Sequence, residues 1–363
     1  MQERSRSFTR VGLIGAGGIA ASMHLPELAA MPERCRVTKI AGRTRARLDL
    51  LAERFTVAQT TTSYAEVIDD PDIDAVVVST PDSAHVEWGI RSIQAGKHLM
   101  MQKPLSTKRD EITAFSAACE QAPNITVMCL PHFGAELASL RMALDDGLVG
   151  RPTGMRAHTS HGGPETYYEQ IAALLGETSP TDLWFFDQDK AGGGALMDIG
   201  VYAVAAVVGV LGPIKSVTAR LATIEKPTRL EDTASLILET DAGVIATAGA
   251  SWCDPAITWT FSVHGSAGRL DFSAGSEPTC TGTRDLRPGA APPEQRTLTV
   301  PAIGTAHNHW LDCVEAGKQP PVANAATAVH VSRVMLAAMT AAAERRTVSL
   351  AELLPQADAI ASR

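Results

Sequence analysis

A short apolar run near the start of the chain passes directly into a cluster of glycines. The run Val11–Ile14 is followed by GAGGIA, which matches the pattern GxGxxA. In this pattern Gly15 permits a tight turn, Gly17 lets the backbone approach a pyrophosphate, and Ala20 keeps the following helix close to the strand. Glycine turns also occur without a ligand, but a position directly after a first strand favours dinucleotide binding.

The first third of the chain alternates strand and helix patterns. Short, continuously apolar runs predict strands at 10–14, 37–41, 75–79, 98–101 and 125–129. Helical patterns lie between them at 19–30, 45–55, 83–95 and 108–121. Buried strands that alternate with helices indicate a doubly wound parallel sheet with helices on both faces. We therefore predict a Rossmann domain over residues 1–126.

The end of the second predicted strand bears on the choice of cofactor. An NAD site places a carboxylate there to bind the ribose 2′-hydroxyl, whereas this chain has Gly42, Arg43 and Thr44. A guanidinium binds a 2′-phosphate in a fork, which favours NADP and leaves NAD possible. The alternative is that Arg43 is a solvent-facing residue that starts the next helix.

Two further segments lie at the carboxyl ends of predicted parallel strands, where open α/β sheets bind ligands. They read STPDSAH, from Ser79, and GKHLMMQKPL, from Gly96. The predicted cofactor-binding residues are Gly15, Gly17, Gly18, Ile19, Gly42, Arg43, Thr44, Thr80, Pro81, His85, Gln102 and Lys103.

The pattern changes near residue 126. A polar stretch with His158 and His161 follows a predicted helix at 136–145. Predicted strands then follow one another closely at 214–222, 233–239, 244–250, 258–264 and 268–272, with a surface loop at 278–295 and helices at 307–316 and 325–344. Closely spaced strands joined by tight turns indicate a largely antiparallel sheet. Residues 127–363 are thus predicted to form an α/β domain that binds substrate and dimerises.

Composition excludes several classes of protein. The 363 residues are 45% hydrophobic, and interspersed charges sum to −8, which argues against nucleic acid and anionic membrane as partners. Glycines interrupt the apolar part of the basic N-terminus, so we do not expect a secretion signal there. The apolar run 201–211 falls short of the roughly 20 residues of a membrane span. The 6 cysteines form no CxxC pair. A soluble protein of the cytoplasm with reduced thiols is expected.

The motifs together resemble the Gfo/Idh/MocA oxidoreductase family. They are the GxGxxA turn, the TPxxxH segment, GKHLMMQKPL in place of the family's GKHVxxEKP, and GGGALMDIGVY over 192–202, which corresponds to GGGxLxDxGxH/Y. The resemblance implies a Rossmann domain followed by an α/β domain whose open sheet face commonly makes a homodimer or homotetramer. It also implies a nicotinamide cofactor and a small polyol or sugar-like substrate.

The resemblance carries residue roles to matching positions. Lys103 corresponds to the lysine that binds cofactor and substrate near the nicotinamide, and Asp198 corresponds to the substrate-side aspartate. Tyr202 stands where many members have histidine, and the glucose–fructose oxidoreductase and dihydrodiol dehydrogenase branch shares the tyrosine. Gln102 departs from the family, which has glutamate before the lysine.

The proposed chemistry also follows from the residue types. Asp198 and Tyr202 are four residues apart, so they share one face of a helix. Oxidation of an alcohol needs a base for the hydroxyl proton, and a lysine cation near a phenol favours its phenolate. Lys103, Asp198 and Tyr202 are therefore the predicted catalytic residues. The alternative is that Tyr202 is a packing aromatic and Asp198 an ordinary residue of the first helical turn.

Other polar and aromatic residues are less specific. His161 and Trp184 are predicted to bind substrate. The pairs His158/His161 and His307/His309 suggest a metal, but neither has a third ligand at a familiar spacing, so no metal is predicted.

The predicted function is NADP-preferring hydride transfer between nicotinamide and a secondary alcohol or ketone of a sugar, inositol or cyclic diol. One alternative is a redox-assisted enzyme that cleaves glycosides and retains its nicotinamide. Another is a dinucleotide-binding regulatory protein without catalysis.

Overall fold

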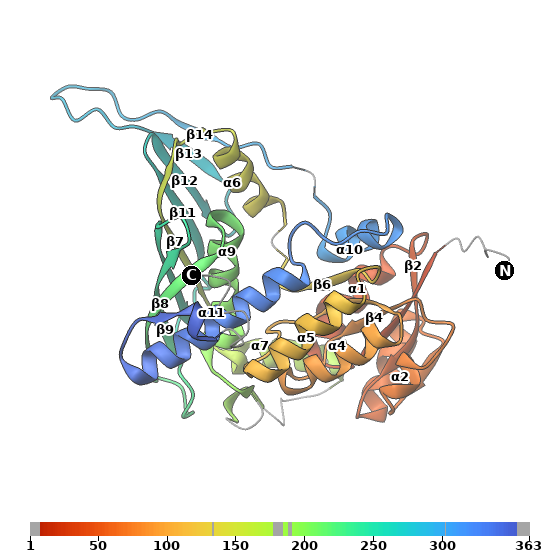
Figure 1. The fold of residues 1–363 in the computed structure, drawn as a ribbon. Coiled ribbons are helices and arrows are strands. Elements are labelled where there is room, and N and C mark those ends of the chain that lie inside the picture. The colour runs from red at the N-terminus through yellow and green to blue at the C-terminus, as the bar shows by residue number, and fades with distance from the viewer. Residues whose placement is uncertain (1–7, 133, 177–183, 188–190, 302, 354–363) are drawn as a thin grey trace. The chain divides into compact units, whose positions relative to one another are not determined.

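The computed structural model describes residues 8–132, 134–176, 184–187, 191–301 and 303–353 (Figure 1). The chain divides into two compact units, each assembled from separate segments. The first unit comprises Met1–His132, Pro164–Gly192 and Gly304–Val329, and the second comprises Phe133–Gly163, Gly193–Ile303 and His330–Arg363. The assignment of cofactor binding to 1–126 and substrate binding to 127–363 stays a prediction, because these units describe packing rather than function.

The first unit is built on a six-stranded parallel sheet in the order β3-β2-β1-β4-β5-β6. Its strands are β1 (Thr9–Ile14), β2 (Cys35–Ala41), β3 (Gln59–Thr61), β4 (Ala75–Val78), β5 (His98–Met101) and β6 (Val127–Cys129). Every residue of β4 is buried, as expected for a strand with layers on both faces. The prediction of a doubly wound parallel sheet is confirmed.

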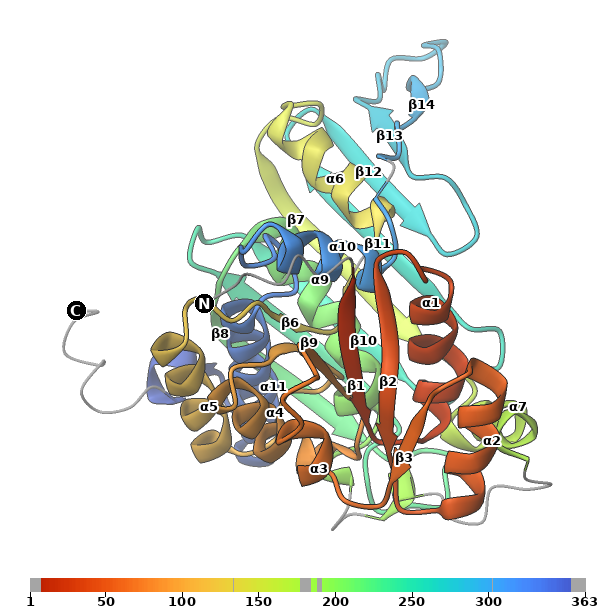
Figure 2. The ribbon, with the colours of Figure 1, turned by 90° about the vertical axis from the view of Figure 1, so that its right-hand side faces the viewer.

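Helices connect these strands and cover the sheet (Figure 2). They are η1 (Ala20–His24), α1 (Leu25–Ala29), α2 (Arg45–Phe55), α3 (Ala65–Ile68), η2 (Asp82–Ala84), α4 (His85–Gln94) and α5 (Arg109–Gln121). Later parts of the chain add α7 (Pro164–Ala172), η3 (Ala173–Leu175), η4 (Trp184–Phe186) and α10 (Ala306–Glu315). Leu311 of α10 and Ile171 of α7 join the same buried cluster as Val11 of β1. The first unit therefore draws its core from segments far apart in sequence.

The second unit contains a nine-stranded sheet in the order β14-β13-β12-β11-β7-β10-β9-β8-β15. Its strands are β7 (Pro152–Ser160), β8 (Ile214–Ala222), β9 (Thr233–Thr240), β10 (Ile245–Ser251), β11 (Trp259–Gly265), β12 (Gly268–Ser273), β13 (Thr279–Gly282), β14 (Gln295–Thr297) and β15 (Val348–Ser349). All neighbouring strands are antiparallel except the pair β7 and β10, which is parallel. The predicted open, largely antiparallel sheet is confirmed.

One face of this sheet carries helices. The helices of the unit are α6 (Ala135–Asp145), the π-helical turn η5 (Leu196–Gly200), α9 (Val201–Leu211) and η6 (Leu350–Leu353). Helix α9 packs on β7 and β10, and α6 packs on α9 and β12. Most residues of α9 are buried, including Val204 and Val207, which explains its continuously apolar sequence.

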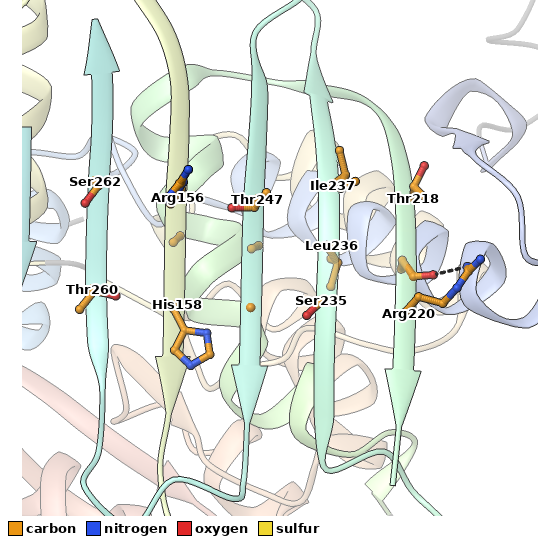
Figure 3. Close-up of a pocket in the computed structure, with 14 residues that line it drawn as sticks. Arg156, His158, Thr218, Arg220, Ser235, Leu236, Ile237, Thr247, Thr260 and Ser262 are labelled. Carbon is orange, nitrogen blue, oxygen red and sulfur yellow. Dashed lines mark hydrogen bonds between the residues drawn. The ribbon is translucent and has the colours of Figure 1, made fainter. Parts of the chain in front are cut away.

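The opposite face of the sheet is lined by polar and aliphatic side chains, among them Arg156, His158, Ile237 and Thr247 (Figure 3). A Cβ atom on Gly249 would lie 2.5 Å from Nδ1 of His158, so glycine leaves room for that imidazole.

Strand β7 occupies part of the predicted polar stretch around His158, where no strand was predicted. Its inward residues are Met155, Ala157 and Thr159, which are buried, and its outward residues include Arg156 and His158. Buried and exposed side chains alternate regularly along β7. The alternation is hard to recognise from hydrophobicity, because the inward residues include small and polar ones and the outward residues are polar or charged. The predicted loop 278–295 likewise begins with β13 and ends at the first residue of β14.

Helix α11 (Ala325–Glu344) is the one described helix that is long and apolar enough to cross a membrane by length and composition alone. Such a test gives weak evidence, since a core helix of a soluble protein also passes it. Val334 and Met335 in α11 are almost fully buried inside the protein, which favours a core helix.

Candidate active site

The predicted cofactor residues gather at one edge of the first sheet. Gly15, Gly42, Thr80 and Gln102 follow the carboxyl ends of β1, β2, β4 and β5 respectively. Strand order reverses between β1 and β4, and open α/β sheets bind ligands at such a reversal. The fold thus brings the separate sequence motifs of the first unit to one place.

Glycine is favoured at each of the three positions after β1 for a different structural reason. Gly15 has φ of +101°, and a Cβ there would lie 2.4 Å from the carbonyl oxygen of Ser79. A Cβ on Gly18 would lie 2.6 Å from Ile171, so the helix packs tightly at that point. A Cβ on Gly17 would meet nothing within 4 Å. Open space in front of Gly17 is what the close approach of a pyrophosphate requires.

The segment after β4 adds a polar atom that fits a ligand. The Oγ1 atom of Thr80 is buried and has no hydrogen-bond partner within the protein. Buried hydroxyls are normally paired, so an unpaired one beside the glycine turn suits a bound molecule. The residues present therefore fit a dinucleotide, on the evidence of Thr80 and of the space at Gly17.

His85 ties the two strand-end segments together. Its Nε2 lies 2.8 Å from the carbonyl oxygen of Thr80, and its Nδ1 lies 2.7 Å from that of Pro104. Burial lowers the pKa of His85, although the two carbonyls act in the opposite direction. A neutral imidazole donates to one of the two carbonyls, and its fully buried ring holds both segments in place.

The residues after β2 and β5 differ in exposure. Arg43 is exposed just beyond β2, next to Gly42, whose backbone lies close to Ala16. Gln102 is buried and Lys103 is half-buried. The contact of Arg43 with a 2′-phosphate stays a prediction.

In the second unit the structure brings Asp198 and His161 together. The backbone N–H of Gly163 donates to Nδ1 of His161 at 2.9 Å, so the ring proton lies on Nε2. That Nε2–H donates to Oδ2 of Asp198 at 3.3 Å. The indole N–H of Trp252 donates to the same oxygen at 3.0 Å. Two N–H donors therefore fix the orientation of the Asp198 carboxylate.

Tyr202 lies at the same end of the second sheet. Its ring is half-buried and packs against Trp259, with ring centroids 4.6 Å apart and an interplanar angle of 52°. Trp259 begins β11, and Trp252 directly follows β10. Asp198 thus contacts the residue that follows β10, and Tyr202 packs on the first residue of β11, two strands that lie on either side of β7.

The start of this helical segment is held by a half-buried glutamate. Glu231 accepts hydrogen bonds from the N–H groups of Gly194 at 2.8 Å and Leu196 at 3.2 Å, and burial raises its pKa. A Cβ on Gly194 would lie 1.9 Å from the carbonyl oxygen of Glu231. From β7, Thr159 donates to the carbonyl oxygen of Ile199 at 2.8 Å. These contacts set the position of Asp198 on the sheet.

Some site residues were not predictable from sequence. Trp252, Trp259 and Glu231 have no motif, and only their polar or aromatic type next to predicted strands marks them. The pair His307/His309, considered as metal ligands, contacts other histidines instead: His307 lies beside His24, and His309 beside His132. Among the residues that the structure describes, no group of three or more His, Cys, Asp or Glu side chains is arranged to hold a metal ion.

Trp184 begins the short turn η4, but its side chain lies outside the part of the chain that the structure describes. The roles of Lys103, Asp198, Tyr202 and His161 stay predictions.

The first unit has a Rossmann sheet with a glycine turn that fits a dinucleotide, and the second has a large open sheet. This combination indicates the class of dinucleotide-dependent oxidoreductases. Family models agree: residues 9–129 match the oxidoreductase family with NAD-binding Rossmann fold, and residues 137–271 match the GFO/IDH/MocA C-terminal domain. The chain belongs to the Gfo/Idh/MocA oxidoreductase family, which confirms the predicted resemblance and an enzymatic role.

Relatives of the chain include sugar and inositol enzymes. The chain is 30% identical over 266 residues to dTDP-3,4-didehydro-2,6-dideoxy-alpha-D-glucose 3-reductase of Actinomadura kijaniata, covering 72% of this chain and 73% of that protein. It is 23% identical to scyllo-inositol 2-dehydrogenase (NADP⁺) of Bacillus subtilis, covering 94% and 96%.

Among solved structures, levoglucosan dehydrogenase in complex with NADH and levoglucosan is similar in fold. The TM-score is 0.79 at 22% identity, over 94% of this chain and 99% of the other.

Proposed function

We propose that the protein is an NADP-preferring oxidoreductase that transfers a hydride between nicotinamide and a secondary alcohol or ketone of a sugar, inositol or cyclic diol. The observation that carries the proposal is the Asp198 carboxylate, oriented by His161 and Trp252 beside Tyr202. A carboxylate held by two donors is preorganised to accept a hydrogen bond from a hydroxyl group. Relatives that act on sugars and inositols support this substrate class.

The first unit supplies the cofactor site of this proposal. When bound, the nicotinamide accepts or donates the hydride. The N–H groups at Gly17–Ile19 receive the pyrophosphate, and the Thr80 hydroxyl gains the partner that it lacks within the protein. We assign Arg43 to the 2′-phosphate because no carboxylate follows β2.

The remaining steps concern the substrate. Lys103 holds the substrate oxygen, and its charge favours the alkoxide that forms as the hydroxyl proton leaves and that becomes the carbonyl as hydride leaves. Tyr202 moves the hydroxyl proton, and Asp198 holds a neighbouring hydroxyl of the polyol. His161 keeps Asp198 in position and lies close enough to contact the same substrate. Convergence of Lys103 with Tyr202 is part of the proposal.

A conservative substitution tests the role of Tyr202. Tyr202→Phe removes one hydroxyl and keeps the ring that packs on Trp259, so folding and NADPH binding should survive. Loss of an acid–base group should lower kcat about a hundredfold to ten-thousandfold on a polyol substrate. Near-normal kcat would make Tyr202 a packing residue and move the proton transfer to Asp198 or Lys103.

We further propose that a second copy of the chain covers the exposed sheet face in Figure 3, as a homodimer or a tetramer of two such dimers. Ile237 and Ile245 are about half exposed there, at 52% and 51%. Aliphatic side chains left on a flat sheet face favour burial against a partner.

The cytoplasm is the proposed location, because all 6 cysteines are free thiols and four of them are buried.

A further inference from the structure

A chain of buried polar side chains extends from Lys103 through the first unit. The N–H of Lys103 lies 3.1 Å from Oε1 of Gln102, and Nε2 of Gln102 lies 3.0 Å from Nε2 of His24. Nδ1 of His24 lies 2.8 Å from Nε2 of His307, and Nδ1 of His307 lies 2.7 Å from Oε2 of Glu27. Both histidines are 0% exposed and Gln102 is 5% exposed. Glu27, at the far end, reaches solvent, with 29% of its side chain exposed.

The direction of every hydrogen bond in this chain is determined. The N–H of Lys103 can only donate, so the atom of Gln102 that faces it is the carbonyl oxygen. The amide nitrogen of Gln102 therefore donates to Nε2 of His24. Burial, and then the neighbouring His307, lower the pKa of His24 far below its ordinary value, so its ring is neutral.

The two imidazoles then have fixed tautomers. His24 accepts at Nε2, so its proton lies on Nδ1 and is donated to Nε2 of His307. His307 accepts at Nε2 and donates from Nδ1 to the Glu27 carboxylate. Every donor points from Lys103 toward Glu27, and hydrogen bonds aligned in one direction strengthen one another.

The far end of the chain is a carboxylate. Burial raises the pKa of Glu27, but hydrogen bonds from His307 and Thr305 lower it, and the net shift is downward. The nearby His132 contacts His309 and is kept neutral, since burial lowers its pKa to about 4. Glu27 is therefore ionised at neutral pH and accepts from His307.

We infer that Gln102, His24, His307 and Glu27 are positioning residues, which form a one-way hydrogen-bond chain that fixes the main chain at Lys103. This inference rests on the proposed function where it concerns catalysis by Lys103, but the chain itself does not depend on it. It also explains Gln102 where the family has glutamate. A carboxamide accepts from Lys103 and donates to His24, and a carboxylate accepts only.

With glutamate at position 102, both ends of the hydrogen-bond chain, residue 102 and Glu27, would be carboxylates that only accept. Gln102→Glu requires His24 to donate from Nε2 while His307 still donates to Glu27. The two inner nitrogens, 2.8 Å apart, then both lack a proton and repel each other. One extra proton shared between the imidazoles removes the conflict, so this variant should hold an imidazolium in the core.

Moving the carboxylate from residue 27 to residue 102 should restore two neutral imidazoles. In the double variant Gln102→Glu with Glu27→Gln, the amide of residue 27 donates to His307, His307 donates to His24, and His24 donates to the new carboxylate. Both histidines then carry the proton on Nε2, and the three bonds between side chains are reversed, while the N–H of Lys103 still donates to residue 102. Packing alone predicts no such exchange of tautomers.

Nitrogen-15 NMR of the histidine rings in the full-length protein tests this directly, without cofactor or substrate. Signals are assigned with His24→Asn and His307→Asn, and His158 on the outer sheet face serves as an internal control. The wild type should show Nδ1–H at both rings, the single variant Gln102→Glu an imidazolium at neutral pH, and the double variant Nε2–H at both. A wild-type spectrum with Nε2–H or a charged ring at either position would overturn the chain.

Kinetics then test the positioning role. Gln102→Glu should lower kcat about twofold to tenfold, which corresponds to the loss of one net hydrogen bond, and change KM less; the double variant should recover most of the loss. If the rings behave as described but the double variant stays as impaired as the single, the chain does not position Lys103. If the wild type itself turns over no polyol, the proposed function fails and the ring assignments stand.

Discussion

A substitution at Gly17 should change cofactor binding without changing the stability of the fold. Gly17→Ala adds a methyl group to a point where nothing lies within 4 Å and where the backbone is not left-handed. The protein should therefore fold with its free energy of unfolding changed by less than about 1 kcal/mol. The added methyl group would occupy the space that we assign to the pyrophosphate.

The expected loss in binding follows from that geometry. A methyl group at Gly17 displaces the phosphate from at least one backbone N–H, and a hydrogen bond to a charged group contributes about 1.5–3 kcal/mol. The dissociation constant of NADPH should rise by roughly tenfold to 150-fold. Gly15→Ala should behave differently. Because Gly15 has a φ of +101° and its added Cβ would lie 2.4 Å from the carbonyl oxygen of Ser79, this substitution should lower the free energy of unfolding by at least about 2 kcal/mol.

Two measurements on each variant distinguish the cases. Urea unfolding without cofactor gives stability, and fluorescence titration with NADPH gives affinity. Gly209→Ala in α9 is a matched control, since its Cβ would make an ordinary 3.5 Å contact with Leu137 within the second unit. Wild-type affinity in Gly17→Ala, or a loss of stability as large as that of Gly15→Ala, would refute the assignment.

Three other predictions address cofactor choice, stability and assembly. Arg43→Ala should weaken NADPH binding about tenfold to a hundredfold and leave NADH binding unchanged, as measured by the same titration; equal loss of both would remove Arg43 from the 2′-phosphate. Asp232 is fully buried, and although burial raises its pKa, hydrogen bonds from the N–H groups of Glu225, Lys226 and Ile224 bring the net pKa below its ordinary value. The ionised Asp232 carboxylate therefore contributes to stability above about pH 4, and this contribution is lost as pH falls through the folded-state pKa. In urea unfolding, Asp232→Asn should lower the free energy of unfolding by about 1–3 kcal/mol at neutral pH and by less in acid. Light scattering should find a dimer or tetramer at micromolar concentration and dissociation by Ile237→Asp; a monomeric wild type would exclude the proposed interface.

The first sheet was predictable because its residues are strongly patterned. Strand β4 is wholly apolar, and helix α2 has the same bounds, 45–55, as the helix predicted from the sequence. The motifs follow parallel strands, whose carboxyl ends necessarily lie at one edge of the sheet. Short β3 was missed, since Gln59–Thr61 is polar and pairs only at the sheet margin.

The second unit was less predictable for a physical reason. Sheet order depends on contacts between segments far apart in sequence, such as β7 beside β10, and local patterns carry no record of them. Asp198 was recognised by its motif, but its partner Trp252 lies 54 residues away and has no motif. The buried pair of His24 and His307, separated by 283 residues, was invisible for the same reason.

Hydride transfer from a polyol is the central claim, and isotope transfer measures it most directly. The protein is incubated with NADP⁺ or NAD⁺ and a panel of sugars, inositols and cyclic diols that carry deuterium on the carbinol carbons, and the nicotinamide is analysed by mass spectrometry. We predict reduced nicotinamide that carries one deuterium from at least one substrate, formed faster with NADP⁺ than with NAD⁺, and abolished or strongly slowed in Tyr202→Phe. Tight binding of NADPH with no deuterium transfer from any member of the panel would contradict the account and favour a regulatory protein or a glycoside-cleaving enzyme that retains its cofactor.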